Sequence, residues 1–163
     1  MDKANPTTFK LSFPQVPGTD SLRDSDEYFL NLYETVLPSI SFDEGEMHWK
    51  GNRSYGSALG ITYGPWNTIF FIDEDFKNYL MIYNWMMLIR DGIEKLHGKN
   101  ALDNQIDATL SVIDNFNKHI VKFKFVNIWP SELGEISFSY QEGESILYCT
   151  VTFLYDYFFV EGI

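Results

Sequence analysis

The residues with the most obvious chemical potential lie between Asp43 and His48, where three carboxylates accompany one imidazole. Asp43, Glu44 and Glu46 precede His48 within a few positions. Carboxylates near an imidazole are the groups that acid–base catalysis or a metal site requires. The same stretch contains Glu44-Gly45, and a Glu-Gly pair between short polar runs is typical of a solvated turn. We therefore interpret the cluster as a hairpin tip and not as a catalytic site.

The other titratable groups give no stronger indication of chemistry. Residues 73–75, Asp-Glu-Asp, precede a helical pattern, where anions are favoured by the helix dipole. Cys149 is the single cysteine, so an intramolecular disulfide is excluded. The three histidines lack the spacing of metal ligands: His48, His97 and His119. The sequence predicts no catalytic residue, no metal and no cofactor, which favours a protein that is not an enzyme.

The composition argues against a protein that binds nucleic acid tightly, and the length predicts one domain over residues 1–163. The net charge of −11 makes a tight grip on DNA phosphates a poor expectation. Aromatic residues make up 17% of the chain, with fourteen Phe and ten Tyr, which favours a sheet-rich fold. The sequence shows no secretory signal and no apolar run long enough to span a membrane. We expect a soluble protein that is synthesised in a cytoplasm.

Alternating apolar and polar residues predict a mainly β fold, a sandwich or barrel carrying one helix. Residues 39–50 suggest two short strands around Glu44-Gly45, followed by a glycine-rich stretch. We expect residues 39–66 to form an extended arm that is ordered by contact with other subunits. Further strands are predicted at 7–16, 27–37, 66–72, 105–113, 119–127, 135–140 and 146–158.

The predicted helix, residues 74–97, is apolar almost all round. Even its polar face is interrupted by Met81 and Leu88. A surface helix in a monomer buries a narrower stripe than this. We therefore expect a neighbouring subunit or a surrounding protein to cover Met81 and Leu88; the alternative is that the arm folds back over the helix.

Trp129-Pro130 interrupts two alternating runs and predicts a corner between sheets. We expect the strand at 119–127 to leave one sheet there and the chain to restart at Glu135 in the other. Pro130 would end the pairing at the rim. The core between the sheets is expected to contain a Trp and three Phe: Trp129, Phe125, Phe138 and Phe153.

Three segments resemble the tail tube proteins of contractile-tailed bacteriophages. The first is "FVNIWPSELGEISFSYQEGESILYCTVTFLYDYF", with Ile128-Trp129-Pro130, Leu133-Gly134 and the run from Thr152 to Tyr157. The second is "YETVLPSISF" and the third is "FFIDEDFKNYLMIYNW". Together the resemblance extends from about Phe9 to Phe158. It implies a two-sheet sandwich related to the tube subunits of type VI secretion.

The resemblance also implies an assembly. Six copies would close into a homohexameric ring, and stacked rings would form the inner tail tube, through which DNA passes without specific binding. The partners would be the tail sheath protein, the baseplate tube initiator and the tail terminator, and the protein would reside in the virion tail. Within the arm, Met47, Trp49 and Tyr55 are the expected subunit and ring contacts.

Three alternatives remain open at the level of sequence. The chain could be a baseplate tube initiator, or a tail-completion or neck ring protein of the same fold. It could be a secretion-system tube subunit. It could also be a carbohydrate-binding sandwich that uses Trp49, Trp66 and Tyr63 as a sugar platform.

Overall fold

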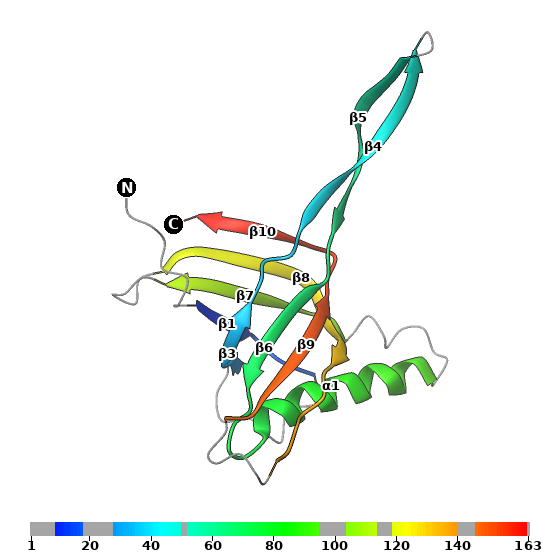
Figure 1. Cartoon of the computed structure of the whole chain (residues 1–163). Helices are drawn as coiled ribbons and strands as arrows, with labels where there is room; N and C mark the ends of the chain where they lie inside the picture. Colours follow the sequence, from blue (N-terminus) through cyan, green and yellow to red (C-terminus); the bar gives the residue numbers. More distant parts are fainter. Residues whose placement is uncertain are drawn as a thin grey trace.

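The computed structural model describes residues 9–17, 28–49, 52–94, 104–113, 119–139 and 146–162. These residues confirm the predicted fold class, mainly β with one helix and two sheets (Figure 1). The elements are β1 Phe9–Phe13, β2 Tyr28–Leu30, β3 Leu32–Thr35, β4 Ile40–Trp49, β5 Asn52–Tyr63, β6 Trp66–Phe71, α1 Lys77–Glu94, β7 Ile106–Ile113, β8 His119–Leu133, β9 Tyr148–Leu154 and β10 Tyr157–Gly162.

The long strand β8 belongs to both sheets. Its first part pairs with β7 on one side and β10 on the other, in the order β2-β1-β7-β8-β10, which we call sheet A. Residues 129–133 pair with β9, in the order β8-β9-β6-β3, which we call sheet B. All of these pairings are antiparallel.

The corner between the sheets lies at Asn127. Asn127 has a φ of 55°, a left-handed conformation that Asn tolerates better than most residues. Its backbone N–H donates to Asp107 Oδ1 at 3.2 Å, and its Nδ2 donates to Asp156 Oδ2 at 2.5 Å. Opposite this corner, β9 and β10 pair with successive parts of β8 and are separated from each other by Tyr155 and Asp156.

The predicted role of Pro130 as the end of a strand is wrong. Pro130 lies opposite Phe153, and β8 continues to Leu133. The ladder accommodates the missing proline N–H through a register shift between Pro130 and Glu132. The predicted strand 146–158 likewise divides into β9 and β10, and the strand 27–37 divides at Asn31 into β2 of sheet A and β3 of sheet B.

The strand predicted at 135–140 does not form over residues 135–139. Leu133 and Ile136 both pack against the core, and a spacing of three cannot be met by a regular strand with period two. The last bond of this ladder runs from Gly134 N to Thr150 O at 2.7 Å. The expectation that Phe138 lies in the core is also wrong, because its side chain is 71% exposed.

Aromatic side chains fill the space between the sheets. Trp66 and Phe125 stack with centroids 4.0 Å apart and an interplanar angle of 4°, and both are fully buried. Phe153 is also fully buried, whereas Trp129 is half-buried at the margin of the core. The Trp66 indole N–H donates to Thr35 Oγ1 at 2.9 Å, which satisfies its polar group.

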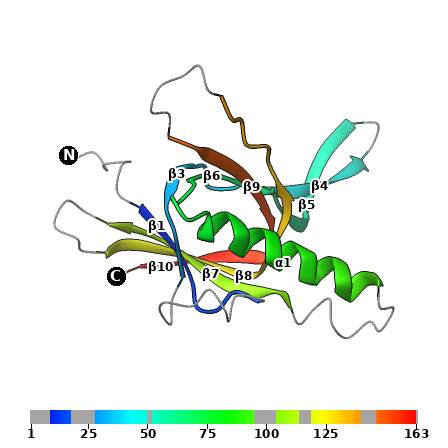
Figure 2. The ribbon, with the colours of Figure 1, turned by 90° about the horizontal axis from the view of Figure 1, so that it is seen from below.

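Helix α1 closes one end of the sandwich (Figure 2). Trp85 is fully buried, and its ring meets Phe13 at 6.0 Å and Phe153 at 6.3 Å. Met81 is only 3% exposed, so the prediction that another subunit covers Met81 is wrong; the chain's own core does so. Leu88 is half-buried, and over helix residues 77–92, whose side chains the structure describes, the exposed large apolar residues are Leu80 and Tyr83.

The helix begins three residues later than predicted, and its first turn contains no acidic residue. The side-chain amide of Asn78 instead provides the hydrogen bonds at the start of the helix. Asn78 Oδ1 accepts the N–H groups of Asp73 at 3.2 Å and Tyr79 at 2.8 Å, and Asn78 Nδ2 donates to Phe71 O at 2.5 Å. The predicted end of the helix, residues 95–97, lies outside the described residues.

Candidate assembly surfaces

The arm is a two-stranded ribbon that projects from the body (Figure 1). Within the part of the chain that the structure describes, β4 and β5 pair with each other and with no other strand. Cα partners run from Ile40↔Tyr63 to Trp49↔Asn52. The turn predicted at Glu44-Gly45 is wrong, because β4 continues through these residues with register shifts beside them. The acidic cluster therefore lies along a strand.

The ribbon continues the edge of sheet B. Thr35 lies opposite Thr68 in the β3–β6 ladder, and Ile40 lies opposite Tyr63 in the arm. Between these ladders, Gly64 N donates to Ser39 O at 2.9 Å. A Cβ at Gly64 would approach Ser39 Oγ to 2.7 Å, so a larger residue here would require the Ser39 side chain to move.

One face of the ribbon is apolar where it leaves the body. We call Ile40, Phe42 and Ile61 the hairpin foot; their side chains are 49%, 62% and 47% exposed. Phe42 lies directly opposite Ile61, so both occupy the same face. Exposed apolar side chains that gather on one face are typical of interaction sites.

The other face of the ribbon is polar, and the foot is anchored through tyrosine. Thr62 Oγ1 and Asp43 Oδ1 are 3.5 Å apart on the polar face. Tyr63 contacts the rings of Tyr155 and Phe158 at 6.0 and 5.7 Å. Tyr155 donates its O–H to Gly64 O at 2.9 Å. The foot therefore has a fixed position on the body while its apolar face stays exposed.

The three arm residues predicted as contacts lie further out along the ribbon. Met47 is opposite Ser54, Trp49 is opposite Asn52, and Tyr55 is opposite Glu46. Their side chains lie outside the described part of the structure. Their role in contacts stays a prediction. The hairpin foot was missed by sequence reasoning, although the alternation of Ile40 and Phe42 is visible in the sequence.

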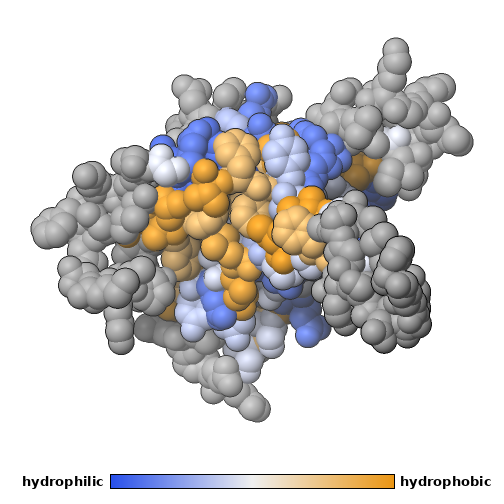
Figure 3. All heavy atoms as spheres, turned by 90° about the horizontal axis from the view of Figure 1, so that it is seen from above, coloured by the Kyte–Doolittle hydropathy of each residue, from blue (hydrophilic) through white to orange (hydrophobic). Residues whose placement is uncertain are grey.

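Strand β10 presents an open edge. It pairs with β8 over six consecutive residues, and no described strand pairs with its other side. Tyr157, Phe159 and Val160 are 46%, 42% and 55% exposed. Hydrophobic residues gather near the centre of the face seen from above (Figure 3). Unpaired edge strands are ready templates for pairing with another chain.

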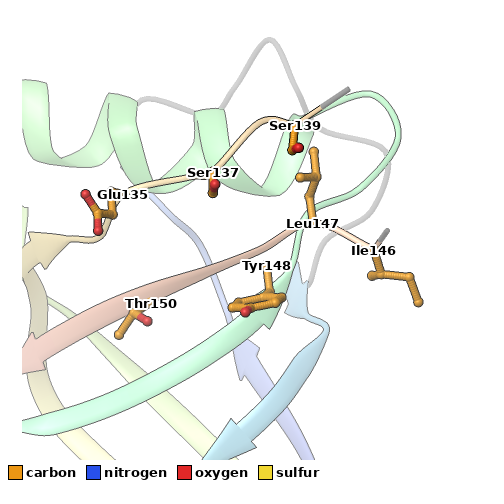
Figure 4. Close-up of a pocket in the computed structure, with 7 residues that line it drawn as sticks. All are labelled: Glu135, Ser137, Ser139, Ile146, Leu147, Tyr148 and Thr150. Atoms are coloured by element: carbon orange, nitrogen blue, oxygen red, sulfur yellow. The ribbon is translucent and has the colours of Figure 1, made fainter. Parts of the chain in front are cut away.

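Sheet B carries an exposed aromatic group next to a groove. Tyr33 meets Phe71 at 5.1 Å and Tyr148 at 6.2 Å, and both tyrosines are more than half exposed. Beside Tyr148, a groove of about 370 Å³ separates the segment after β8 from β9 (Figure 4). Its lining is mainly hydroxyl and apolar, with Glu135 as its one carboxylate. This chemistry suits contact with another surface more than catalysis.

The predicted sugar platform does not assemble. Trp66 is fully buried under Phe125, and Tyr63 is half-buried against the body. A platform needs exposed ring faces, so the proposed role of Trp66 is wrong. The side chain of Trp49 lies outside the described part of the structure.

Titratable groups in the described ranges are dispersed. No three His, Cys, Asp or Glu side chains among them are placed to share a metal ion. Burial raises the pKa of the Cys149 thiol above its ordinary value. The pKa of Tyr155 is raised to about 12. Burial of the hydroxyl is the larger cause, and the nearby Tyr63 is the smaller one. Among the described helices, none has the length and apolar character needed to cross a membrane.

Comparison with known proteins places these surfaces in context. Residues 4–161 match the family model described as phage tail tube protein. The chain is 29% identical over 167 residues to the tail tube terminator protein of Enterobacteria phage T4, covering 98% of this chain and 90% of that protein.

Solved structures share the fold at low sequence identity. A chain of the six-fold symmetrised baseplate of the anti-feeding prophage superposes with a TM-score of 0.69 at 9% identity, covering 99% of this chain and 97% of the other. A chain from the sheath/tube terminator of the PVC extracellular contractile injection system gives 0.68 at 13% identity, with 99% of both chains covered. Hcp1 from Salmonella typhimurium gives 0.52 at 16%, covering 91% and 82%.

Proposed function

Because the chain belongs to the phage tail tube protein family, we propose that it is the ring-forming subunit that ends a phage tail tube, a tail tube terminator. The observation that carries the proposal is the 29% identity to the T4 tail tube terminator over almost the whole of both chains. The role is structural, in the virion tail, and needs no catalytic residue.

The exposed surfaces support a closed ring with a further contact along the ring axis. An open β10 edge gives neighbouring copies a site for lateral pairing. The hairpin foot presents apolar side chains that the chain itself leaves exposed. We propose six copies per ring, with the arm contacting the adjoining tube ring, the sheath outside and DNA passing through the centre.

The inner tail tube subunit is the second candidate. The family model is described as phage tail tube protein, which favours it. A tube subunit polymerises with copies of itself, whereas a terminator forms one ring that binds the end of a different polymer. A baseplate initiator would behave like the terminator but bind the opposite end of the tube. The Hcp1 likeness shows the fold alone and does not support a secretion role.

Electron microscopy of the purified full chain separates these candidates. We expect single rings at high protein concentration that do not elongate, and rings bound at one end of preformed tail tubes. Long tubes from the pure protein would replace the terminator role with the tube subunit role. A protein that stays monomeric alone and with tubes would contradict both.

A further inference from the structure

We propose that the groove between β9 and the segment after β8 binds an extended segment of a separate protein, which adds a strand to sheet B. The bound segment carries a lysine or arginine beside β-branched residues. The groove has a volume of about 370 Å³, with Glu135 and Ser137 on one side and Tyr148 and Thr150 on the other (Figure 4). The site lies within a single chain and does not depend on the proposed function.

Strand β9 has backbone groups that face the groove and that no described strand pairs. On the β6 side, Ile72 N donates to Leu147 O at 2.9 Å. On the β8 side, Gly134 N donates to Thr150 O at 2.7 Å. Successive residues of an antiparallel strand direct their N–H and C=O groups to alternate sides, so those of Tyr148 point to the same side as those of Thr150. Beyond Gly134, the described residues provide no backbone partner for Tyr148 on that side.

The segment 135–139 is kept apart from β9 by contacts on its other side. Ile136 packs against the core. The Phe138 ring stacks with the Phe76 ring, with centroids 6.5 Å apart and an interplanar angle of 21°. Phe76 has a φ of 56°, a conformation that a bulky residue keeps only where the surrounding structure fixes it. The groove is therefore part of the fold, and an added strand can enter it without displacing another strand.

The register of sheet B indicates which side chains the added strand would carry. Leu133 lies opposite Val151 at the end of the β8–β9 ladder. An antiparallel strand that continues this ladder places one residue opposite Tyr148, on the same face as its exposed ring. That ring stacks with Tyr33 at a centroid distance of 6.2 Å. Because β-branched side chains pair well with aromatic rings across strands, we expect valine or isoleucine at this position.

Charge favours a bound segment that carries a lysine or arginine. Glu135 is exposed and is the one carboxylate among the residues that line the groove. Strands β3, β6 and β9 and residues 129–139 contain Glu34, Glu132 and Glu135 and no Lys or Arg. The whole chain has 23 acidic and 12 basic residues, so a basic partner complements this surface better than a second acidic copy does.

The test uses the purified full chain and a fluorescein-labelled synthetic peptide, Lys-Val-Thr-Val-Ser-Val. Fluorescence anisotropy measures the dissociation constant, and hydrogen exchange detected by mass spectrometry locates the bound peptide. Tyr148→Pro removes the backbone N–H that faces the groove. Tyr148→Ala removes the same ring but keeps the N–H, so it is the matched control. Circular dichroism shows whether each variant folds.

We expect the peptide to slow hydrogen exchange at residues 146–150 of the parent protein. Tyr148→Pro should raise the dissociation constant about tenfold relative to Tyr148→Ala, because one main-chain hydrogen bond is lost. Equal constants in the two variants, no binding by the parent protein, or protection confined to other residues would overturn the inference. Self-association of the parent protein that the peptide reverses would also overturn it, because the occupant would then be a second copy.

An exchange of charges tests the site without changing the backbone, and it decides the matter if Tyr148→Pro does not fold. Glu135→Lys should raise the dissociation constant of the lysine peptide about threefold, a modest effect because the pair is exposed to solvent. The same variant should bind more tightly a peptide in which glutamate replaces the lysine. Glu34→Lys, at the other edge of sheet B, is the matched control and should change neither constant. Equal changes in both variants would overturn the inference.

Discussion

The body and the arm of this protein both contain large apolar side chains, but the body buries them and the arm leaves them exposed. In the body, Trp66, Phe125 and Phe153 lie between two sheets and are fully buried by their own chain. In the hairpin foot, Ile40, Phe42 and Ile61 occupy one side of a ribbon and remain about half exposed. Hydrophobic burial therefore stabilises the folded chain fully in the first case and only in part in the second. The single chain therefore buries its own core, and under the proposed function the exposed side chains of the foot would be covered by a neighbouring subunit.

The strongest test of this comparison is Trp66→Ala. Removing a fully buried Trp from a stacked aromatic core should lower the free energy of unfolding by about 3–5 kcal/mol. Urea denaturation followed by circular dichroism measures it. Trp66→Phe keeps most of the packing and should cost less. Trp129→Ala, at a half-buried site, should also cost less; equal losses would place Trp129 in the core.

The corner at Asn127 should give the next largest effect. Asn127→Ala removes the side-chain hydrogen bond to Asp156. It also places at positive φ an alanine, whose side chain cannot form the local hydrogen bonds by which Asn tolerates this conformation. Together these changes should lower the free energy of unfolding by about 2 kcal/mol. Asn127→Gly removes the same bond but tolerates the conformation, so it should cost about half as much. Thermal denaturation of both variants makes the comparison. Identical losses would show that conformation at this corner is unimportant.

The hairpin foot should show the reverse behaviour, with a small effect on stability and a large one on assembly. Phe42→Ser with Ile61→Ser should change the free energy of unfolding by less than about 1 kcal/mol, because both side chains are largely exposed. The same variant should lose contact between the ring and the tail tube, measured by electron microscopy. Ser41→Ala with Thr62→Ala, on the opposite face, should keep it. A foot variant that still binds tubes would remove the foot from the interface.

The smallest effect concerns pH at the junction of body and arm. Tyr155 has a folded pKa of about 12 against an ordinary value of 10.0. A raised pKa for an acid favours the neutral form, so its contribution is complete below pH 10 and is lost as pH rises through about 12. The melting temperature should fall over that range, and less steeply in Tyr155→Phe. Parallel curves for parent and variant would contradict the assignment.

The sequence was sufficient to predict the fold class because alternation and a single helical pattern are local signals. It could not predict the end of the ladder after Gly134, since the mismatch between Leu133 and Ile136 appears only once the core side is known. For the same reason Phe138 was assigned to the core, and Met81 to an interface. A side chain's neighbours across sheets are a tertiary property that periodicity does not contain.

The surfaces proposed for assembly were likewise predictable from the sequence only in part. The arm was visible from its length and glycine content, but its hairpin register through Glu44-Gly45 was not, because bulges preserve pairing where turn residues predict reversal. The row of polar residues Lys10, Ser111 and Lys122 across sheet A was invisible in the sequence for a further reason. Lys10 and Lys122 are far apart along the chain and meet only through Ser111 in the sheet.

The continuity of the ribbon with sheet B has a mechanical consequence. At about 3.3 Å per residue, the ten residues of β4 extend about 33 Å from the body, so a rotation of about 10° at the foot displaces the far end by about 6 Å. The hydrogen bond from Gly64 N to Ser39 O at 2.9 Å lies at the base of this lever. In the proposed ring, small adjustments of the contacts of Tyr63 and Tyr155 at the base of the arm would therefore move its far end by several times as much without any rearrangement of the core.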